Sequence, residues 1–297
     1  MSQAPEQIVS FSYKFRSQLY DFSKRTYIMG ILNVTPDSFS DGGRFFNLEQ
    51  AVARGKQMVD EGADFIDIGG ESSRPGSDPV SADEELRRVL PVVEALTKTV
   101  AIPVSIDTYK SKVADEALKA GAEIVNDISG MTFDSEMIEV VRRLKACVVL
   151  MHMKGTPKSM QQNPVYENVV EEVSGFLSGQ AGKLRIEGID RVILDPGIGF
   201  GKSYHHNLEL LKNLRTFTQL GYPLLVGPSR KSFIGKLLDA SVDDRLEGTA
   251  AAVTTSILRG ANIVRVHDVK EMKKVALVAY ALRNDSQPTD YVDERAD

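Results

Sequence analysis

The sequence predicts a closed (β/α)8, or TIM, barrel with its functional site at the C-terminal ends of the strands. Three observations support this fold: eight short apolar runs, room for at least one helix between consecutive runs, and a polar residue after each run. In such a barrel the C-terminal ends of all strands meet at one mouth. Side chains between Asn33 and His267 are therefore expected to converge on a single site.

The predicted strands are the apolar runs themselves. They are Tyr27–Leu32, Phe65–Ile68, Ile102–Ile106, Glu123–Val125, Cys147–Met151, Val192–Leu194, Pro223–Val226 and Ile263–Val266. The polar residues at or just after their ends are, in order, Asn33, Glu71 with Arg74, Asp107, Asn126, His152, Asp195, Lys231, and Arg265 with His267.

Helices are predicted where apolar residues recur with a period of 3.6 positions. They span Leu48–Glu61, Ala82–Thr97, Lys110–Ala120, Glu136–Leu144, Glu167–Glu187, Asn207–Leu220, Arg245–Leu258 and Val269–Arg283. Three of the helices are followed by a glycine–alanine pair, at Gly62, Gly121 and Gly260. A glycine there supplies the left-handed residue that ends a helix, so each pair marks the return to a strand.

The barrel is expected to occupy residues 26–285 as one domain. Residues 1–25 form an N-terminal extension in which a strand near Ile8–Phe15 closes the bottom of the barrel, and residues 286–297 form a disordered acidic tail. The length of 297 residues and the 42% hydrophobic content fit a barrel of about 250 residues.

Composition restricts the functional class. The net charge of −5 argues against a nucleic-acid surface, so an anion must be bound by a local group of cations. The single cysteine, Cys147, lies in an apolar run, which favours a buried thiol over a nucleophile. One cysteine cannot form an internal disulfide, which fits the cytoplasm, and we find neither a secretory signal nor a membrane-spanning apolar run.

A polar loop follows the first predicted strand. From Asn33 to Gly43 it contains an amide, two acids and three hydroxyls. An amide oxygen near carboxylates and hydroxyls suits Mg²⁺, which binds few protein groups and retains phosphate oxygens. A plain turn with an Asn or Asp cap explains the same composition equally well.

A second loop follows the second predicted strand. Its paired glycines, Gly69 and Gly70, let the backbone approach a ligand, and Arg74 can bind an anion through its fork of donors. A surface turn with a solvated arginine is the alternative. The density of glycine and proline around Arg74 favours a functional loop.

Carboxylates and an amide follow three other strands. Asp107, Asn126 and Asp195 offer acceptors that suit a donor-rich heterocycle, although Asp107 could instead cap the following helix. The glycine-rich run from Asp195 to Lys202 does not have the spacing of a phosphate-binding Walker loop. His152 lies between two methionines and is expected to be a wall residue.

The remaining candidates are mostly cations. Arg230 and Lys231 are adjacent at a helix start, and alternation places Arg265 and His267 on one side of their strand. Together with Arg74 they favour a phosphorylated or diphosphate substrate. A diphosphate beside a flat heterocycle indicates a substitution in which diphosphate leaves. No spacing indicates zinc.

Seven segments carry a resemblance to a known family. MGILNVTPDSFSDGG, DIGGESSRPG, SIDT, NDIS, LDPGIGFGK, GPSRKS and RVHDV stand in the order of the dihydropteroate synthase family. The sequence resembles that family from about Ile28 to Ala281. The resemblance implies a Mg²⁺-dependent transferase that joins 6-hydroxymethyl-7,8-dihydropterin diphosphate to 4-aminobenzoate and releases diphosphate. It also implies a homodimer and sensitivity to sulfonamides.

The resemblance further implies roles for individual residues. The pterin would be held by Asp107, Asn126, Asp195, Lys231, Gly227 and Phe200. The diphosphate would be held by Asn33, Arg74, Arg265 and His267, with Asn33 also binding Mg²⁺. Aminobenzoate would contact Phe39, Ser73, Pro75, Arg230 and Ser232, and Asp107, Lys231 and Arg74 would be catalytic. Position 73 departs from the family, which usually has threonine there.

Two alternatives stay open. A related pterin barrel moves a methyl group from methyltetrahydrofolate to a corrinoid, but such barrels do not need the loop around Phe39 or the turn at Arg74, and both are present here. A non-catalytic pterin-binding paralogue would be indicated by loss of Asp107, Arg74 or Lys231, and all three are present.

Overall fold

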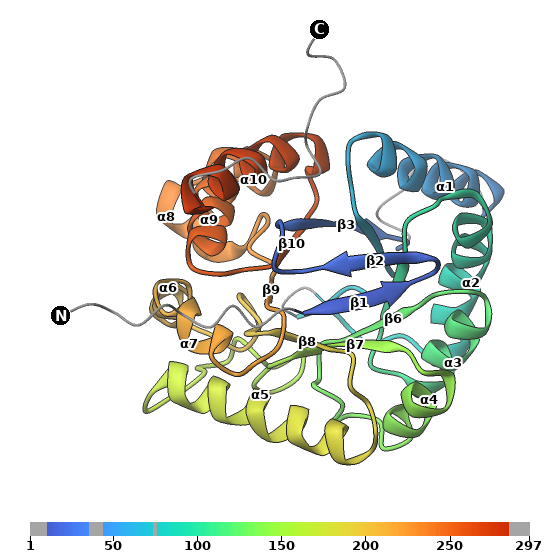
Figure 1. The fold of residues 1–297 in the computed structure, drawn as a ribbon, viewed down its shortest axis with the longest axis horizontal. Coiled ribbons are helices and arrows are strands. Elements are labelled where there is room, and N and C mark those ends of the chain that lie inside the picture. Colours follow the sequence, from blue (N-terminus) through green and yellow to red (C-terminus); the bar gives the residue numbers. More distant parts are fainter. Residues whose placement is uncertain (1–10, 36–43, 74–75, 285–297) are drawn as a thin grey trace, which may run out of the picture.

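The computed structural model describes residues 11–35, 44–73 and 76–284. Eight parallel strands lie in the order β8-β7-β6-β5-β4-β3-β10-β9. A parallel bridge between Leu194 and Leu224 joins the two ends of this order, so the sheet is a nearly closed barrel. Helices surround the strands, and a separate hairpin lies across the barrel in the view of Figure 1. The predicted fold class is confirmed.

The barrel strands are β3 (Tyr27–Asn33), β4 (Phe65–Gly69), β5 (Val104–Asp107), β6 (Ile124–Asp127), β7 (Cys147–Met151), β8 (Val192–Asp195), β9 (Leu225–Val226) and β10 (Ile263–Val266). The helices are α1 (Arg44–Asp60), α2 (Ala82–Thr99), α3 (Ser111–Lys119), α4 (Met137–Leu144), α5 (Val169–Ile186), α6 (Tyr204–Lys212), α7 (Leu214–Thr218), α8 (Ser232–Leu238), α9 (Leu246–Leu258) and α10 (Val269–Asn284), with a 3-10 turn, η2 (Val242–Asp244). Among these described helices, none is both long enough and apolar enough to cross a membrane.

Two helix predictions need correction. The helix expected over Asn207–Leu220 is two helices, α6 and α7, which meet at Asn213, where φ is −113° and the side chain donates to a carbonyl of the preceding turn. Helix α6 also begins earlier than expected, because Ser203 and His206 form a reciprocal capping box. Helix α8 was not among the predicted helices, although a helix start at Ser232 was expected.

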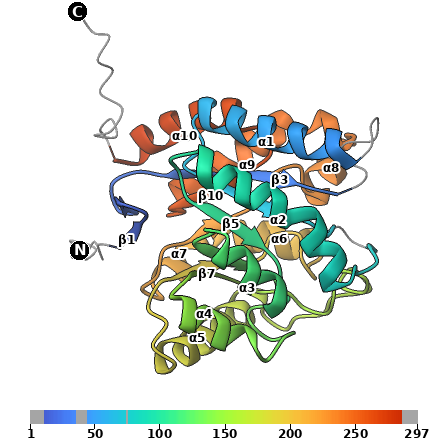
Figure 2. The same cartoon turned by 90° about the vertical axis from the view of Figure 1, so that its right-hand side faces the viewer.

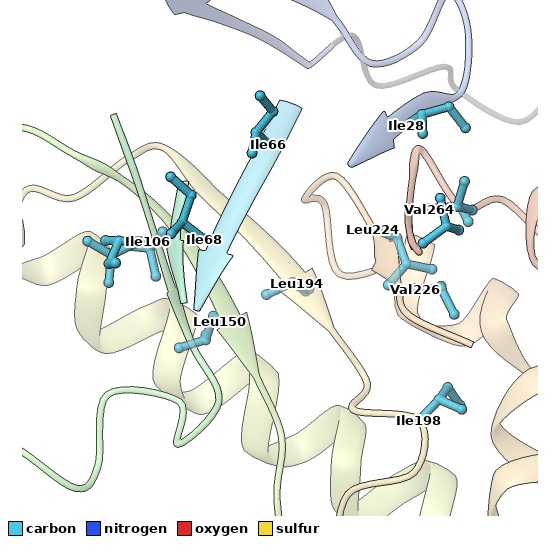
Figure 3. Close-up of a cluster of buried hydrophobic side chains, with 14 of the residues drawn as sticks. Ile28, Ile66, Ile68, Ile106, Leu150, Leu194, Ile198, Leu224, Val226 and Val264 are labelled. Carbon is cyan, nitrogen blue, oxygen red and sulfur yellow. The ribbon is translucent and has the colours of Figure 1, made fainter. Parts of the chain in front are cut away.

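The larger apolar core lies between the strands and the helices. Outward-facing strand residues such as Ile66 and Ile68 of β4 pack with apolar residues of the helices in one buried cluster. Figure 3 draws part of this cluster, with labelled residues from strands around the barrel. In the side view of Figure 2, α1, α2, α3 and α4 follow one another along the outside of the barrel.

The bottom of the barrel is closed by a hairpin rather than by the single predicted strand. Strands β1 (Ser12–Phe15) and β2 (Gln18–Asp21) pair antiparallel, and residues 8–10 of the prediction lie outside the described part. Phe15 is fully buried, and its ring centroid lies 5.6 Å from that of Phe65 of β4. The hairpin therefore fills the lower barrel interior with aromatic rings.

The interior of the barrel changes from apolar to polar along the strands. The lower layer is a separate buried cluster that contains Phe65, Ile124, Cys147, Ile193 and Ile263. Cys147 is a core thiol as predicted, and burial raises its pKa to about 12. Residues two positions further along a strand face the same side. In β4, β6, β8 and β10 these residues are Asp67, Asn126, Asp195 and Arg265.

Candidate active site

Polar side chains from four strands are joined by hydrogen bonds across the barrel mouth. Arg265 Nε donates to Asp67 Oδ2 at 2.6 Å, and Arg265 Nη2 donates to Asp107 Oδ2 at 2.7 Å. Asn126 Nδ2 donates to the same oxygen of Asp67 at 2.8 Å. Strands β4, β5, β6 and β10 thus bring together Asp107, Asn126 and Arg265, as the sequence predicted.

Asp67 is the member of this cluster that the sequence analysis missed. Its side chain has no solvent exposure, whereas Asp107 and Arg265 remain 13% and 14% exposed at the mouth. The prediction considered the ends of strands, and Asp67 lies inside β4. The available signal was an acid in the middle of an otherwise apolar run, Phe65–Gly69. Such a buried charge needs a partner, which Arg265 provides.

The charge of Asp107 is set by its surroundings. Burial raises the pKa of Asp107 to about 7, although the guanidinium of Arg265 opposes this rise. The carboxylates of Asp67 and Glu85 raise the pKa further, and Lys231 lowers it. The surroundings of Asp107 therefore favour its protonated form more than water does.

Asp195 and Lys231 form a second part of the site. Asp195 ends β8 and accepts a hydrogen bond from the backbone of Gly197 at 2.7 Å, and burial raises its pKa to about 6. Burial and the charge of Arg265 lower the pKa of Lys231 to about 8, against the opposing effect of Asp195 and Asp107. Asp107, Asp195, Lys231 and Arg265 thus influence one another across one mouth.

Phe200 and the glycines near it define the wall beside Lys231. The Lys231 ammonium lies 3.9 Å from the centroid of the Phe200 ring. Gly199 has φ of +85°, and a Cβ at this position would lie 2.8 Å from Lys231 Cδ. Gly227 follows β9, and a Cβ there would lie 3.8 Å from Arg265 Cβ. The glycines leave room for the lysine stem and for a flat ligand near these side chains.

His267 lies near the cations but is not itself a cation. Its Nδ1 is 3.0 Å from Ser229 Oγ, and the same hydroxyl accepts a hydrogen bond from the His267 backbone at 3.2 Å. Burial lowers the pKa of His267 to about 3, and the charges of Arg265, Arg230 and Lys231 add to this effect. The predicted cationic set therefore contains a neutral imidazole that acts through hydrogen bonds.

Arg230 is already engaged by an acid. Its Nε and Nη2 donate to the two carboxylate oxygens of Asp268 at 3.0 and 2.6 Å, and its φ is +56°. The Arg230 carbonyl accepts a hydrogen bond from Arg245 at 3.0 Å. These contacts fix the loop between β9 and α8, which carries Lys231 and Ser232. The predicted contact of Arg230 with aminobenzoate stays a prediction.

The base of the second loop is held by a buried ionic network that the sequence analysis did not identify. Lys110 Nζ donates to Glu71 Oε2 at 2.5 Å and also binds Glu85, while the Tyr109 hydroxyl donates to Glu71 Oε1 at 2.6 Å. Glu71 was predicted only as a strand-end residue. The network fixes the chain two residues before Ser73. Arg74, Pro75 and Phe39 lie outside the described residues.

His152 is a wall residue, as expected. It is 6% exposed, and Lys202 Nζ lies 3.0 Å from its Nδ1. Lys202 also donates to the carbonyls of His152 and Phe200 at 3.1 and 2.9 Å. Burial lowers the pKa of His152 to about 3 and that of Lys202 to about 7. This pair joins the end of β7 to the glycine-rich loop after β8.

Two side-chain oxygens lie near Gly69 at the mouth. A Cβ at Gly69 would lie 3.7 Å from Asp107 Oδ2 and 3.8 Å from Asn33 Oδ1, and Asp107 Oδ2 also accepts a hydrogen bond from Arg265. Within residues 11–35, 44–73 and 76–284, no group of three histidine, cysteine or carboxylate side chains forms a metal cage. Carboxylate and amide oxygens are donors of the kind that Mg²⁺ prefers.

Comparison with known proteins agrees with this geometry. Residues 29–267 match the family described as pterin binding enzyme. A dihydropteroate synthase from Synechocystis is 51% identical and covers 89% of this chain and 92% of its own length, and the Bacillus subtilis enzyme is 47% identical, covering 89% and 90%.

Solved structures give the same result. Dihydropteroate synthase from Yersinia pestis, with a sulfonamide drug complex, has a TM-score of 0.86 and 42% identity over 92% of this chain and 99% of that one. The Xanthomonas albilineans enzyme, in complex with 7,8-dihydropteroate, has a TM-score of 0.81 and 41% identity over 90% and 96%. The buried acids and cations of the mouth therefore stand in a chain that belongs to the pterin-binding enzyme family and, within it, to the dihydropteroate synthases.

Proposed function

We propose that this barrel mouth condenses 6-hydroxymethyl-7,8-dihydropterin diphosphate with 4-aminobenzoate to give 7,8-dihydropteroate and diphosphate. The observation that carries the proposal is the convergence of Asp107, Asp195, Lys231 and Arg265 on one space. The solved relatives that hold 4-aminobenzoic acid and 7,8-dihydropteroate support the same pair of ligands.

The pterin would lie against the strand ends. Its edge is rich in N–H donors, and Asp195, Asn126 and Asp107 present acceptors on three strands. Phe200 offers an aromatic face next to the ammonium of Lys231, which can donate to an acceptor on the heterocycle. Recognition by several buried polar side chains would make the site selective for a pterin, because a ligand that leaves these side chains without hydrogen-bond partners binds poorly.

The reaction exchanges one bond for another at the pterin methylene. The bond between this carbon and the diphosphate oxygen breaks, and its electron pair stays on the diphosphate. The aminobenzoate nitrogen supplies the electron pair of the new bond and releases one proton to solvent. An aromatic amine is unprotonated at neutral pH, so this step needs no dedicated base. The carboxylate of Asp107 would stabilise positive charge that develops on the methylene.

The diphosphate would be held by Arg265, by the neutral His267 and by Arg74 of the second loop. Asn33 would hold Mg²⁺ through its amide oxygen, which lies near Gly69. When bound there with the diphosphate, Mg²⁺ supplies positive charge to the leaving group. The hydroxyl of Ser229, bonded to His267, fixes the orientation of the imidazole.

Aminobenzoate would occupy the outer part of the mouth. The residues proposed to shape its site are Phe39, Ser73, Pro75, Arg230 and Ser232. Asp268 already binds the Nε and Nη2 edge of the Arg230 guanidinium, and Nη1 lies 3.3 Å from Asp243 Oδ1. We assign Arg230 the role of fixing the Lys231 loop as well as adding positive charge at the rim.

We also propose a homodimer and a cytoplasmic location. Val278 and Leu282 on α10 are 62% and 69% exposed, and Leu258 on the neighbouring helix α9 is 37% exposed. Exposed apolar residues on two adjacent helices favour an interface with a second copy. The cytoplasmic location rests on the single buried thiol, Cys147.

Diphosphate release tests the proposed reaction. Purified protein is given the pterin diphosphate and Mg²⁺, with and without 4-aminobenzoate, and release is followed by a coupled enzyme assay. A synthase releases diphosphate only when both substrates are present. A corrinoid methyltransferase releases none, and a pterin-binding paralogue binds without release. Lys231→Met should abolish activity, whereas Lys236→Met, an exposed lysine on α8, should leave it unchanged.

A further inference from the structure

Asp67, a fully buried acid beneath the mouth, has no contact role in the reaction described above. It lies one interior layer below Asp107, because Gly69 is the register partner of Asp107 and Asp67 is the partner of Ser105. Its side chain has no solvent exposure. A buried carboxylate this far inside a barrel must act through the groups that it binds.

We propose that Asp67 is a positioning residue that fixes the amide of Asn126 and holds Arg265 against Asp107. The inference rests on the proposed function, because Asn126 and Arg265 are the groups that would meet the substrate. Both donate to a single oxygen of Asp67, at 2.8 and 2.6 Å.

The first consequence concerns the direction of the Asn126 amide. An ionised carboxylate can only accept hydrogen bonds, so Asp67 selects the NH2 group of Asn126. Arg265 donates to the same oxygen of Asp67, so this oxygen accepts from both neighbours. The amide oxygen of Asn126 is then directed away from Asp67 and is left to accept from the pterin. Without a carboxylate at position 67, the amide could adopt either orientation and would present a donor part of the time.

The second consequence concerns the position of Arg265. Its guanidinium lies between two carboxylates, Asp67 and Asp107, and its donors bind both. Without a carboxylate at position 67, Arg265 keeps only the bond to Asp107, so one carboxylate instead of two holds its guanidinium.

Asp67→Asn tests the inference, because it keeps the size of the side chain and removes the charge. We expect the affinity for 7,8-dihydropteroate, measured by calorimetry, to fall about tenfold, as expected for one misdirected buried hydrogen bond. The KM for the pterin diphosphate should rise more than the KM for 4-aminobenzoate.

Two variants serve as matched controls. Asp127→Asn removes another fully buried carboxylate one residue from Asn126, but Asp127 binds the backbone of Ser129 and Met131 instead of the cluster. Ser105→Ala alters the register partner of Asp67, whose hydroxyl is buried and has no hydrogen-bond partner among the described residues. Neither variant should change the affinity for 7,8-dihydropteroate, even if its melting temperature changes.

The outcomes separate this inference from the proposed function. If the wild-type protein releases diphosphate and Asp67→Asn leaves both the dihydropteroate affinity and the KM for the pterin diphosphate unchanged, Asp67 is only structural and the inference is wrong. A wild-type protein that releases no diphosphate overturns both.

A measurement on the wild-type protein covers the case in which Asp67→Asn does not fold. The side-chain NH2 signal of Asn126, assigned by its loss in Asn126→Asp, should exchange slowly with solvent in the free protein. Exchange at the rate of a short peptide would contradict the bond to Asp67.

Discussion

Asp107→Asn is the substitution that most directly tests the electrostatic role of the mouth. In the structure Arg265 is shared by Asp67 and Asp107. With both acids ionised, two carboxylates and one guanidinium leave a net negative charge at this point. The substitution keeps the shape of residue 107 and leaves Arg265 paired with Asp67, so the local charge becomes zero.

The size of the effect follows from Coulomb's law. One unit charge at about 4 Å from the pterin methylene, at an effective dielectric constant of about 20, contributes roughly 4 kcal/mol. If this energy applies to the transition state and not to the bound substrate, turnover falls by about three decades. Asn126, Asp195 and Lys231 remain in place, so pterin affinity should change by less than about tenfold.

The assay compares the two quantities separately. Single-turnover diphosphate release gives the rate of the chemical step, and calorimetry with 7,8-dihydropteroate gives affinity. A rate within tenfold of the wild type would refute the charge argument. Equal losses in rate and affinity would assign Asp107 to binding alone. The thermal midpoint of the variant should be measured in parallel, because loss of folded protein would reduce both quantities together.

Three further predictions follow from the geometry. The profile of kcat/KM should be bell-shaped, rising as Asp107 loses a proton near pH 7 and falling as Lys231 loses one near pH 8, which a buffer series checks. Phe15→Ala should lower the free energy of unfolding by about 3–5 kcal/mol. It should not change kcat, because the hairpin lies at the opposite end of the barrel from the mouth. A thermal unfolding midpoint, measured by calorimetry, that fell by less than about 5 °C would contradict the expected loss of stability. Gly199→Ala should displace Lys231 and raise the KM for the pterin diphosphate, whereas Gly188→Ala, at a similar φ with open space around it, should lower only stability.

The sequence alone was sufficient for the barrel and for most of the mouth. The apolar runs are short, and each is followed by a polar or charged residue of a kind that is rare in the centre of a buried strand. The sequence therefore indicated both the strands and the positions at which they end. Asp107, Asn126 and Asp195 lie at the ends of β5, β6 and β8 as expected. The bounds of β9 were less accurate, since only Leu225–Val226 pairs as a strand after Pro223.

The parts that could not be predicted depend on contacts between distant segments. Asp67 can be recognised as a partner of Arg265 only when it is known that the two side chains, on β4 and β10, point into the same barrel interior. The neutral state of His267 depends on burial and on three nearby cations, which its sequence position does not indicate. The capping role of His206 is local, but its side chain accepts from the backbone of Ser203 at a position where a capping box usually has glutamate or glutamine.

The charge of the mouth also explains which state of the reaction the site is built to stabilise. Among the described residues, Asp67, Asp107 and Asp195 face Lys231 and Arg265, Lys202 also lies near Asp195, and His267 is neutral. The three acids offset these cations, so in the proposed function the positive charge for the diphosphate would come from Arg74 and from a cation bound with it. The same set favours a cationic methylene once the diphosphate begins to leave. The residues beneath the pterin are therefore complementary to the transition state more than to the substrate.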